Sequence, residues 1–136
     1  MEGGRIKHVL VVDDEPMIRQ LVADCLVEAG FQAETAANGS EALRSMQRTR
    51  PDLIVLDLMM PVLNATGFLE LVRLTPHYAR VPIVVITATY NAFEEAARLG
   101  AQACLSKPFE LDDLVAEVAR LIGRPERALY PSATPA

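Results

Sequence analysis

Short apolar runs and longer amphipathic segments alternate five times along the chain. The apolar runs predict five strands, at Ile6–Val12, Phe31–Ala36, Leu53–Asp57, Pro82–Ile86 and Ala103–Leu105. Apolar residues at helical spacing predict five helices, around Ile18–Ala29, Ala42–Met46, Phe68–Leu74, Asn91–Leu99 and Leu111–Ile122. Strictly alternating strands and helices are typical of an α/β fold. We therefore expect a doubly wound, five-stranded parallel sheet with helices on both faces.

The most apolar of these runs ends in a carboxylate. Leu53 to Leu56 form a continuous hydrophobic stretch, which indicates a central strand buried on both faces, and Asp57 follows at once. Open α/β sheets keep their ligand sites at the carboxyl ends of the strands. An aspartate in this position can equally be a turn residue or a helix N-cap, so the other strand ends decide between these interpretations.

Reactive side chains stand at three further predicted strand ends. They are Asp13 and Asp14 after the first strand, Thr87 after the fourth and Lys107 after the fifth. The carboxyl ends of parallel strands share one edge of the sheet, so these groups converge with Asp57 if their strands are neighbours.

Three carboxylates close together, with only one ammonium beside them, would repel one another strongly. A hard divalent cation relieves that repulsion. Mg²⁺ favours a few carboxylates together with waters and phosphate oxygens. A carboxylate held beside Mg²⁺ and Lys107 is equipped to attack a phosphoryl group, which would give an aspartyl phosphate at Asp57. The Thr87 hydroxyl could bond a phosphoryl oxygen. The pattern predicts phosphoryl transfer to Asp57.

The composition and charge of the chain narrow its possible binding partners and its location in the cell. The chain has 136 residues, about half of them hydrophobic, and a formal charge of −5 without a basic block, which argues against direct contact with nucleic acid. No segment looks long enough to cross a membrane, and the N-terminus does not resemble a signal peptide, so we expect a cytoplasmic protein.

Cys25 and Cys104 lie in apolar segments and are expected to be buried thiols. Residues 1–123 are expected to form the domain, and 124–136 a flexible tail or a linker to an absent output domain.

Four motifs resemble a known family. They are Val9-Leu10-Val11-Val12-Asp13-Asp14-Glu15-Pro16, Asp57-Leu58-Met59-Met60-Pro61, Ile86-Thr87-Ala88 and Lys107-Pro108-Phe109. In this order, on this strand pattern, they resemble the response-regulator receiver domains of two-component signalling, over residues 6 to about 122.

The resemblance implies the flavodoxin-like strand order 2-1-3-4-5 and specific residue roles. Asp57 would be the phosphoacceptor. Asp14, Asp57 and the Met59 carbonyl would bind Mg²⁺ directly, and Asp13 would help through water. Lys107 would pair with the phosphoryl group. Such a domain is not an enzyme in the usual sense, although it assists its own phosphorylation and dephosphorylation.

The resemblance also implies partners. The donor would be a phosphohistidine on a sensor histidine kinase or a histidine phosphotransfer protein. Thr87 would act as the switch, and the face formed by the fourth helix, fifth strand and fifth helix would pass the signal to a downstream protein or an output domain. We expect a monomer or a weak dimer through that face. Nucleic acid and membrane are not expected partners.

Two positions depart from the family pattern. Cys104 stands where the family usually has the aromatic switch residue, and it is too small to fill the same space, so we hypothesise a weakened or rerouted switch. Ala65 stands where a glycine is usual in the turn after Pro61. Alanine tolerates positive φ poorly, so this turn should differ in shape or length.

Three other interpretations compete with this one. A receiver-like module that binds proteins without phosphorylation would not need the full set of acidic residues, Thr87 and Lys107. A phosphatase of the haloacid-dehalogenase type would need a second aspartate two residues after the first, where this chain has Met59. A nucleotide-binding α/β domain would need a glycine-rich turn after the first strand, where this chain has Asp13-Asp14-Glu15-Pro16.

Overall fold

The computed structural model describes residues 6–59, 65–88 and 92–124. Its strands form one sheet and are β1 (His8–Val12), β2 (Gln32–Ala36), β3 (Leu53–Asp57), β4 (Ile83–Thr87) and β5 (Ala103–Ser106). Every neighbouring pair is parallel, and the order is β2-β1-β3-β4-β5. The predicted strand order and the parallel sheet are therefore confirmed.

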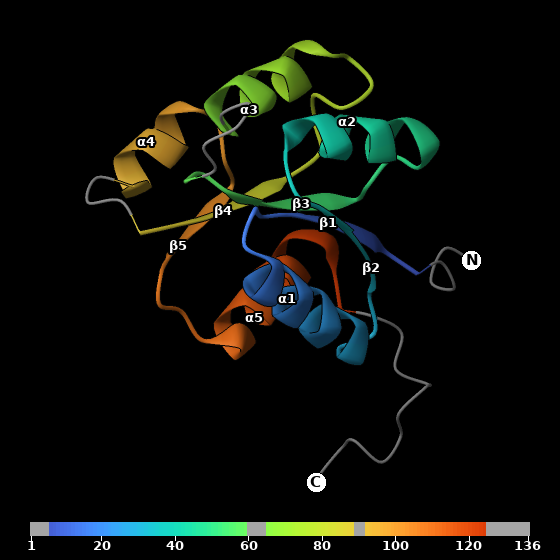
Figure 1. Ribbon diagram of the computed structural model, residues 1–136, viewed down its shortest axis with the longest axis vertical. Helices are drawn as coiled ribbons and strands as arrows, with labels where there is room; N and C mark the ends of the chain where they lie inside the picture. Colours follow the sequence, from blue (N-terminus) through green and yellow to red (C-terminus); the bar gives the residue numbers. More distant parts are fainter. Residues whose placement is uncertain (1–5, 60–64, 89–91, 125–136) are drawn as a thin grey trace, which may run out of the picture.

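Helices cover both faces of this sheet (Figure 1). They are α1 (Pro16–Glu28), α2 (Gly39–Arg48), α3 (Ala65–Leu74), α4 (Ala92–Arg98) and α5 (Leu111–Ile122). Helices α2, α3 and α4 lie on one face, and α1 and α5 lie on the other. The doubly wound α/β architecture is confirmed.

The strands alternate their side chains between two hydrophobic clusters. In β1, Leu10 and Val12 pack in the cluster beneath α2, α3 and α4, while Val9 and Val11 pack in the cluster beneath α1 and α5. All residues of β3 and β4 are buried, as expected for central strands of a parallel sheet. Each fully buried aliphatic side chain contributes roughly 1.5–3 kcal/mol, so the two central strands firmly fix the position of the residues at their carboxyl ends.

The helix ends follow local sequence signals. Pro16 occupies the first turn of α1, and Gly30 after its end has a φ of 105°, which a residue with a side chain rarely adopts. The Asn38 side chain caps α2 by accepting from the Glu41 amide at 2.9 Å, and Glu41 accepts in return from the Ala37 amide at 2.8 Å.

Some details differ from the prediction. Ala65 is not in a loop: it begins α3 and is buried in the core, because an alanine fits the first turn of a helix without positive φ. The thiols of Cys25 and Cys104 are free, but both residues are half-buried rather than buried. Cys104 lies on the edge strand β5, which has only one neighbour in the sheet. Asn91, the expected cap of α4, and the expected tail from 125 to 136 lie outside the described residues.

Candidate functional site

The predicted site residues follow strands that are neighbours in the sheet. Val12 pairs with Leu56, so Asp13 and Asp57 come one step later on adjacent strands. Thr87 is the last residue of β4 and pairs with Ser106 of β5, directly before Lys107. The order of the sheet therefore places all these residues at one edge, as the sequence predicted.

Three carboxylates form a compact cluster at this edge. One carboxylate oxygen from each of Asp13, Asp14 and Asp57 lies within 4.8 Å of the others. Asp57 and Asp13 are 2% and 1% exposed, whereas Asp14 is exposed. Two of the three carboxylates are thus shielded from water. Negative charges repel each other more strongly in the protein interior than in water.

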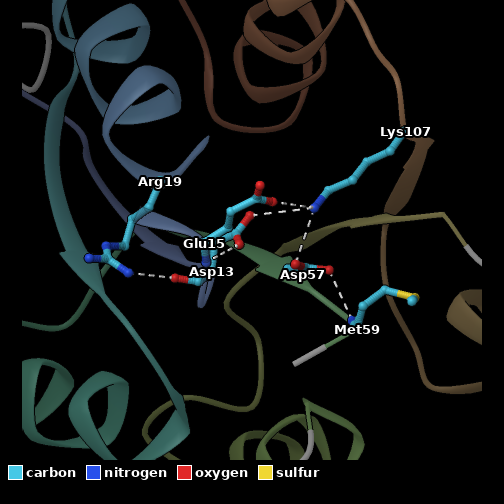
Figure 2. A network of polar contacts seen from close by, with 6 residues as sticks. All are labelled: Asp13, Glu15, Arg19, Asp57, Met59 and Lys107. Atoms are coloured by element: carbon cyan, nitrogen blue, oxygen red, sulfur yellow. Dashed lines mark hydrogen bonds and ion pairs between the residues drawn. The ribbon is translucent and has the colours of Figure 1, made fainter. Parts of the chain in front are cut away.

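Lys107 brings a positive charge into this cluster (Figure 2). Its Nζ lies 3.2 Å from Asp57 Oδ2 and donates a hydrogen bond to it. It also lies 3.9 Å from Asp13 Oδ2 and 3.9 Å from Glu15 Oε1. The ammonium therefore faces several carboxylates at once, and its nearest partner is Asp57.

Backbone groups hold the two buried carboxylates in place. The Met59 amide donates to Asp57 Oδ1 at 2.9 Å, and the Glu15 amide donates to Asp13 Oδ1 at 2.9 Å. The Arg19 guanidinium donates to the Asp13 carbonyl oxygen at 2.9 Å (Figure 2). Each carboxylate thus has one oxygen fixed by a backbone N–H and the other directed toward Lys107.

Burial raises the pKa of the Asp13 carboxyl to about 6, and the charge on Asp57 adds to this rise. The Glu15 amide and the Lys107 ammonium act in the opposite direction. For Lys107, burial alone would lower the pKa, but the charges of Asp57 and Asp13 outweigh burial, and the pKa lies above its usual range. The cluster thus carries an excess of negative charge.

The cluster also fits a hard metal ion. Among the described residues, Asp13 Oδ2 is a buried oxygen that accepts no hydrogen bond. An unmatched carboxylate oxygen, together with the carboxylates of Asp14 and Asp57, is the oxygen-rich ligand set that Mg²⁺ prefers. A divalent cation there would satisfy that oxygen and offset the surplus charge.

The two predicted switch positions lie close to this edge in the sheet. Thr87 is fully buried at the end of β4, and its carbonyl accepts from the Lys107 amide at 2.9 Å. Cys104 pairs with Val85 and packs against the cluster beneath α2, α3 and α4, together with Leu99 and Ala101. Cys104 thus lies three residues before Lys107, on the side of the sheet that carries α4.

Sequence reasoning missed Glu15 and Arg19. The sequence pattern indicates only a part in the helix start for Glu15, yet its carboxylate reaches Lys107, and Arg19 reaches the backbone of Asp13. Their position directly after the acidic pair and in the first turn of α1 was the available signal, because that turn abuts the end of β1.

An apolar groove adjoins the site. It has a volume of about 390 Å³ and is bordered by Lys107 itself. Its other lining residues come from α1, the segment after β5 and the start of α5: Ile18, Leu21, Val22, Pro108, Phe109 and Leu111. Two large apolar side chains of α1, Met17 and Leu21, are 80% and 51% exposed. The acceptor site and an exposed apolar surface are thus continuous.

The family model of the response regulator receiver domain matches residues 9–119. The chain belongs to this family. It is therefore a receiver domain of two-component response regulators, which are signalling domains rather than classical enzymes.

Curated relatives and solved structures agree with this assignment. The receiver domain is 41% identical over 124 residues to the transcriptional regulatory protein PrrA of Mycobacterium leprae, covering 90% of this chain and 52% of that protein. It is 32% identical to a probable chemotaxis protein CheY of Rhizobium etli, covering 85% and 92%. The structure of the Vibrio cholerae chemotaxis protein CheY4 matches with a TM-score of 0.80 and 37% identity, covering 87% of this chain and 100% of that one.

The receiver domain spans about half the length of PrrA and nearly the whole of the CheY relative. Within residues 6–59, 65–88 and 92–124, no helix has the length and apolar character needed to cross a membrane.

Proposed function

We propose that Asp57 accepts a phosphoryl group from a phosphohistidine, and that the receiver domain passes the resulting change to a partner. One observation carries this proposal: the buried Asp57 carboxylate stands within 4.8 Å of two other carboxylates and 3.2 Å from an ammonium. Carboxylates that serve only as helix caps or turn residues do not need such surroundings. A phosphoryl acceptor does, since charge on the transferred group must be neutralised.

The side chains divide the work of transfer. An Asp57 oxygen attacks phosphorus, and the bond between phosphorus and the donor nitrogen breaks, with its electron pair leaving on the imidazole. Lys107 donates a hydrogen bond to Asp57 Oδ2 and is therefore placed to form an ion pair with a phosphoryl oxygen. Asp13, Asp14, Asp57 and the Met59 carbonyl would hold Mg²⁺, which supplies further positive charge to those oxygens when bound. The same groups would assist hydrolysis of the aspartyl phosphate.

The change would leave the site through Thr87 and the face of α4, β5 and α5. The Thr87 hydroxyl, at the end of β4, can form a hydrogen bond to a new phosphoryl oxygen. The Thr87 carbonyl also accepts a hydrogen bond from the Lys107 amide. Cys104 lies on β5 in this face and is half-buried against the cluster beneath α2, α3 and α4. With a small thiol in place of an aromatic ring, the read-out through this face would be weak or take another route.

The apolar groove beside Lys107 supports a docking place for the protein that carries the phosphohistidine. Its partner must bring phosphorus to within bonding distance of Asp57, and the groove is continuous with the site through Lys107. We expect Leu21→Glu to slow transfer from a phosphohistidine protein at least tenfold, without slowing labelling by phosphoramidate, since a charge in an interface core is costly. Leu74→Glu, on an exposed apolar residue of α3, is the matched control.

The proposal extends to the organisation of the protein. Residues 1–123 would act as the receiver and 124–136 as a tail or a linker. The PrrA relatives are transcriptional regulators of about twice the length, which supports an output domain beyond this segment, whereas the CheY relative supports a separate protein partner. In either arrangement, the domain would be a monomer or would pair weakly through α4, β5 and α5.

Intact-mass spectrometry tests the function. Wild type and Asp57→Asn are incubated with phosphoramidate, with Mg²⁺ or with a chelator. We expect one phosphoryl group on wild type in the presence of Mg²⁺ and none on the variant. Absence of labelling on wild type, under conditions that label the CheY relative, would instead support a module that binds partners without phosphorylation.

A further inference from the structure

Glu15 is the residue at which helix α1 begins, and its side chain faces the acceptor site rather than its own helix. It occupies the N-cap position with an extended backbone (φ −95°, ψ 110°), but its carboxylate accepts no capping hydrogen bond. Its Oε1 lies instead 3.9 Å from the Lys107 ammonium. The Glu15 charge therefore belongs to the electrostatic surroundings of Lys107.

The carboxylates around Lys107 differ in exposure. Asp57 and Asp13 are buried, whereas the Glu15 side chain is 59% exposed. Of the three carboxylates that pair with the ammonium, Glu15 thus stands on the side that is open to solvent. A phosphodonor that comes from solvent brings its oxygens to this side, where Lys107 attracts them and Glu15 repels them.

We propose that Glu15 is a specificity-determining residue, which disfavours phosphodonors more strongly the more negative charge they carry. This inference rests on the proposed phosphoacceptor function. During transfer, an electron pair of the Asp57 carboxylate forms the new bond to phosphorus, and the bond from phosphorus to the donor breaks with its pair leaving on the donor atom. Glu15 makes and breaks no bond, and acts on the charge of the incoming donor.

Two small donors differ in the property that matters. Acetyl phosphate is a dianion at neutral pH, and its leaving group is acetate. Phosphoramidate is a monoanion at neutral pH, and its nitrogen departs as ammonia with the proton that the monoanion already carries. The P–N bond of phosphoramidate is also the bond present in a phosphohistidine. Glu15 thus favours phosphoramidate over acetyl phosphate, the donor with more negative charge, and it would protect the signal from acyl phosphates in solution.

The test compares initial labelling rates with both donors, at saturating Mg²⁺, for wild type, Glu15→Gln and Glu110→Gln. Glu110 is a matched control because it is also exposed, also occupies a helix N-cap, at α5, and also makes no capping hydrogen bond. Each substitution removes one negative charge, so both variants have the same formal net charge.

We expect Glu15→Gln to raise the rate with acetyl phosphate about two- to fivefold, the size typical of interactions between exposed charges. The rate with phosphoramidate should rise less, so the ratio of the two rates increases. Glu110→Gln should leave this ratio at the wild-type value. The gain should shrink between about 0.05 and 0.5 M salt, because exposed charges are screened over a shorter distance as salt rises.

Two results would overturn the inference: an unchanged ratio in Glu15→Gln, which includes equal acceleration with both donors, or the same shift of the ratio in Glu110→Gln. A purely structural part for Glu15 at the start of α1 would change both rates together and lower the melting temperature, so the ratio separates the two roles. Wild type that takes no phosphoryl group from either donor would overturn the phosphoacceptor function as well. Labelled wild type with an unmoved ratio would overturn only the discrimination by Glu15.

Discussion

The Lys107 ammonium lies 3.2 Å from Asp57 Oδ2, although the two residues are 50 positions apart in the chain. The parallel sheet makes this contact, because β3 and β5 end at the same edge with only β4 between them. Asp57 is buried and Lys107 partly buried, so the pair is screened less than a surface ion pair. This ion pair holds the Asp57 carboxylate, which would attack phosphorus, beside the Lys107 ammonium, which would neutralise the phosphoryl oxygens.

Removing Lys107 should affect stability and metal binding in opposite directions. In Lys107→Met, the buried Asp57 carboxylate loses its nearest cation, and we expect the metal-free protein to be destabilised by about 2 kcal/mol. Mg²⁺ should bind more tightly, because no ammonium competes for the carboxylates. Urea unfolding and calorimetric Mg²⁺ titration measure these effects. Lys7→Met alters the only other lysine and should change neither quantity; weaker Mg²⁺ binding in Lys107→Met would contradict this competition.

Asp13 should make the metal-free protein less stable at neutral pH. Its pKa of about 6 in the folded protein lies above the ordinary value of 3.8, so the folded state binds this proton more tightly. Stability is therefore greatest below about pH 4 as far as this group is concerned, and falls as pH rises through 6. Asp13→Asn should raise the free energy of unfolding at pH 7 by on the order of 2 kcal/mol and by much less at pH 4.

Denaturant unfolding in the presence of a chelator measures this difference at both pH values. Asp24→Asn, at an exposed position of α1, is the control for loss of a negative charge and should be nearly neutral. A stabilisation by Asp13→Asn that is equal at pH 4 and pH 7 would show that charge burial is not its cause.

Arg73 joins α3 to the turn between α4 and β5. Its guanidinium donates to the carbonyl oxygens of Ala79, Val81 and Gly100 and to the Gln102 side chain, at 2.8–3.1 Å. We expect Arg73→Ala to cost about 2–3 kcal/mol of stability, because several acceptors lose their donor at once. Arg98→Ala removes only a 3.8 Å surface pair and should cost less than about 0.5 kcal/mol, so equal losses would contradict this role.

Much of this arrangement could be predicted from the sequence. The continuous apolar run of β3 identified a central strand, and the polar residues at the ends of β1, β4 and β5 then had to meet Asp57 at one edge. The position of Glu15 after the acidic pair indicates that it lies near the site, but its contact with Lys107 depends on side-chain geometry where α1 turns away from β1, which the sequence does not give. The half-burial of Cys104 was likewise missed, because an apolar run does not reveal that its strand lies at the edge of the sheet.

Cys104 offers a test of the signalling face. Cys104→Tyr places an aromatic ring at a half-buried position of β5, against the cluster beneath α2, α3 and α4, and we expect it to enlarge the phosphorylation-dependent NMR shifts in α4, β5 and α5. Cys25→Tyr, the same change at the other half-buried cysteine, on α1, is the control. Identical shifts in wild type and Cys104→Tyr would argue against a weakened switch.

The central claim is that Asp57 is the residue that takes the phosphoryl group. Borohydride reduces an aspartyl phosphate to homoserine, and tandem mass spectrometry then places the modified residue in the sequence. After labelling with phosphoramidate and Mg²⁺, we predict homoserine at position 57 of the wild type and no modified residue in tryptic digests of Asp57→Asn. Homoserine at position 13 or 14, or labelling that persists in Asp57→Asn, would contradict this claim.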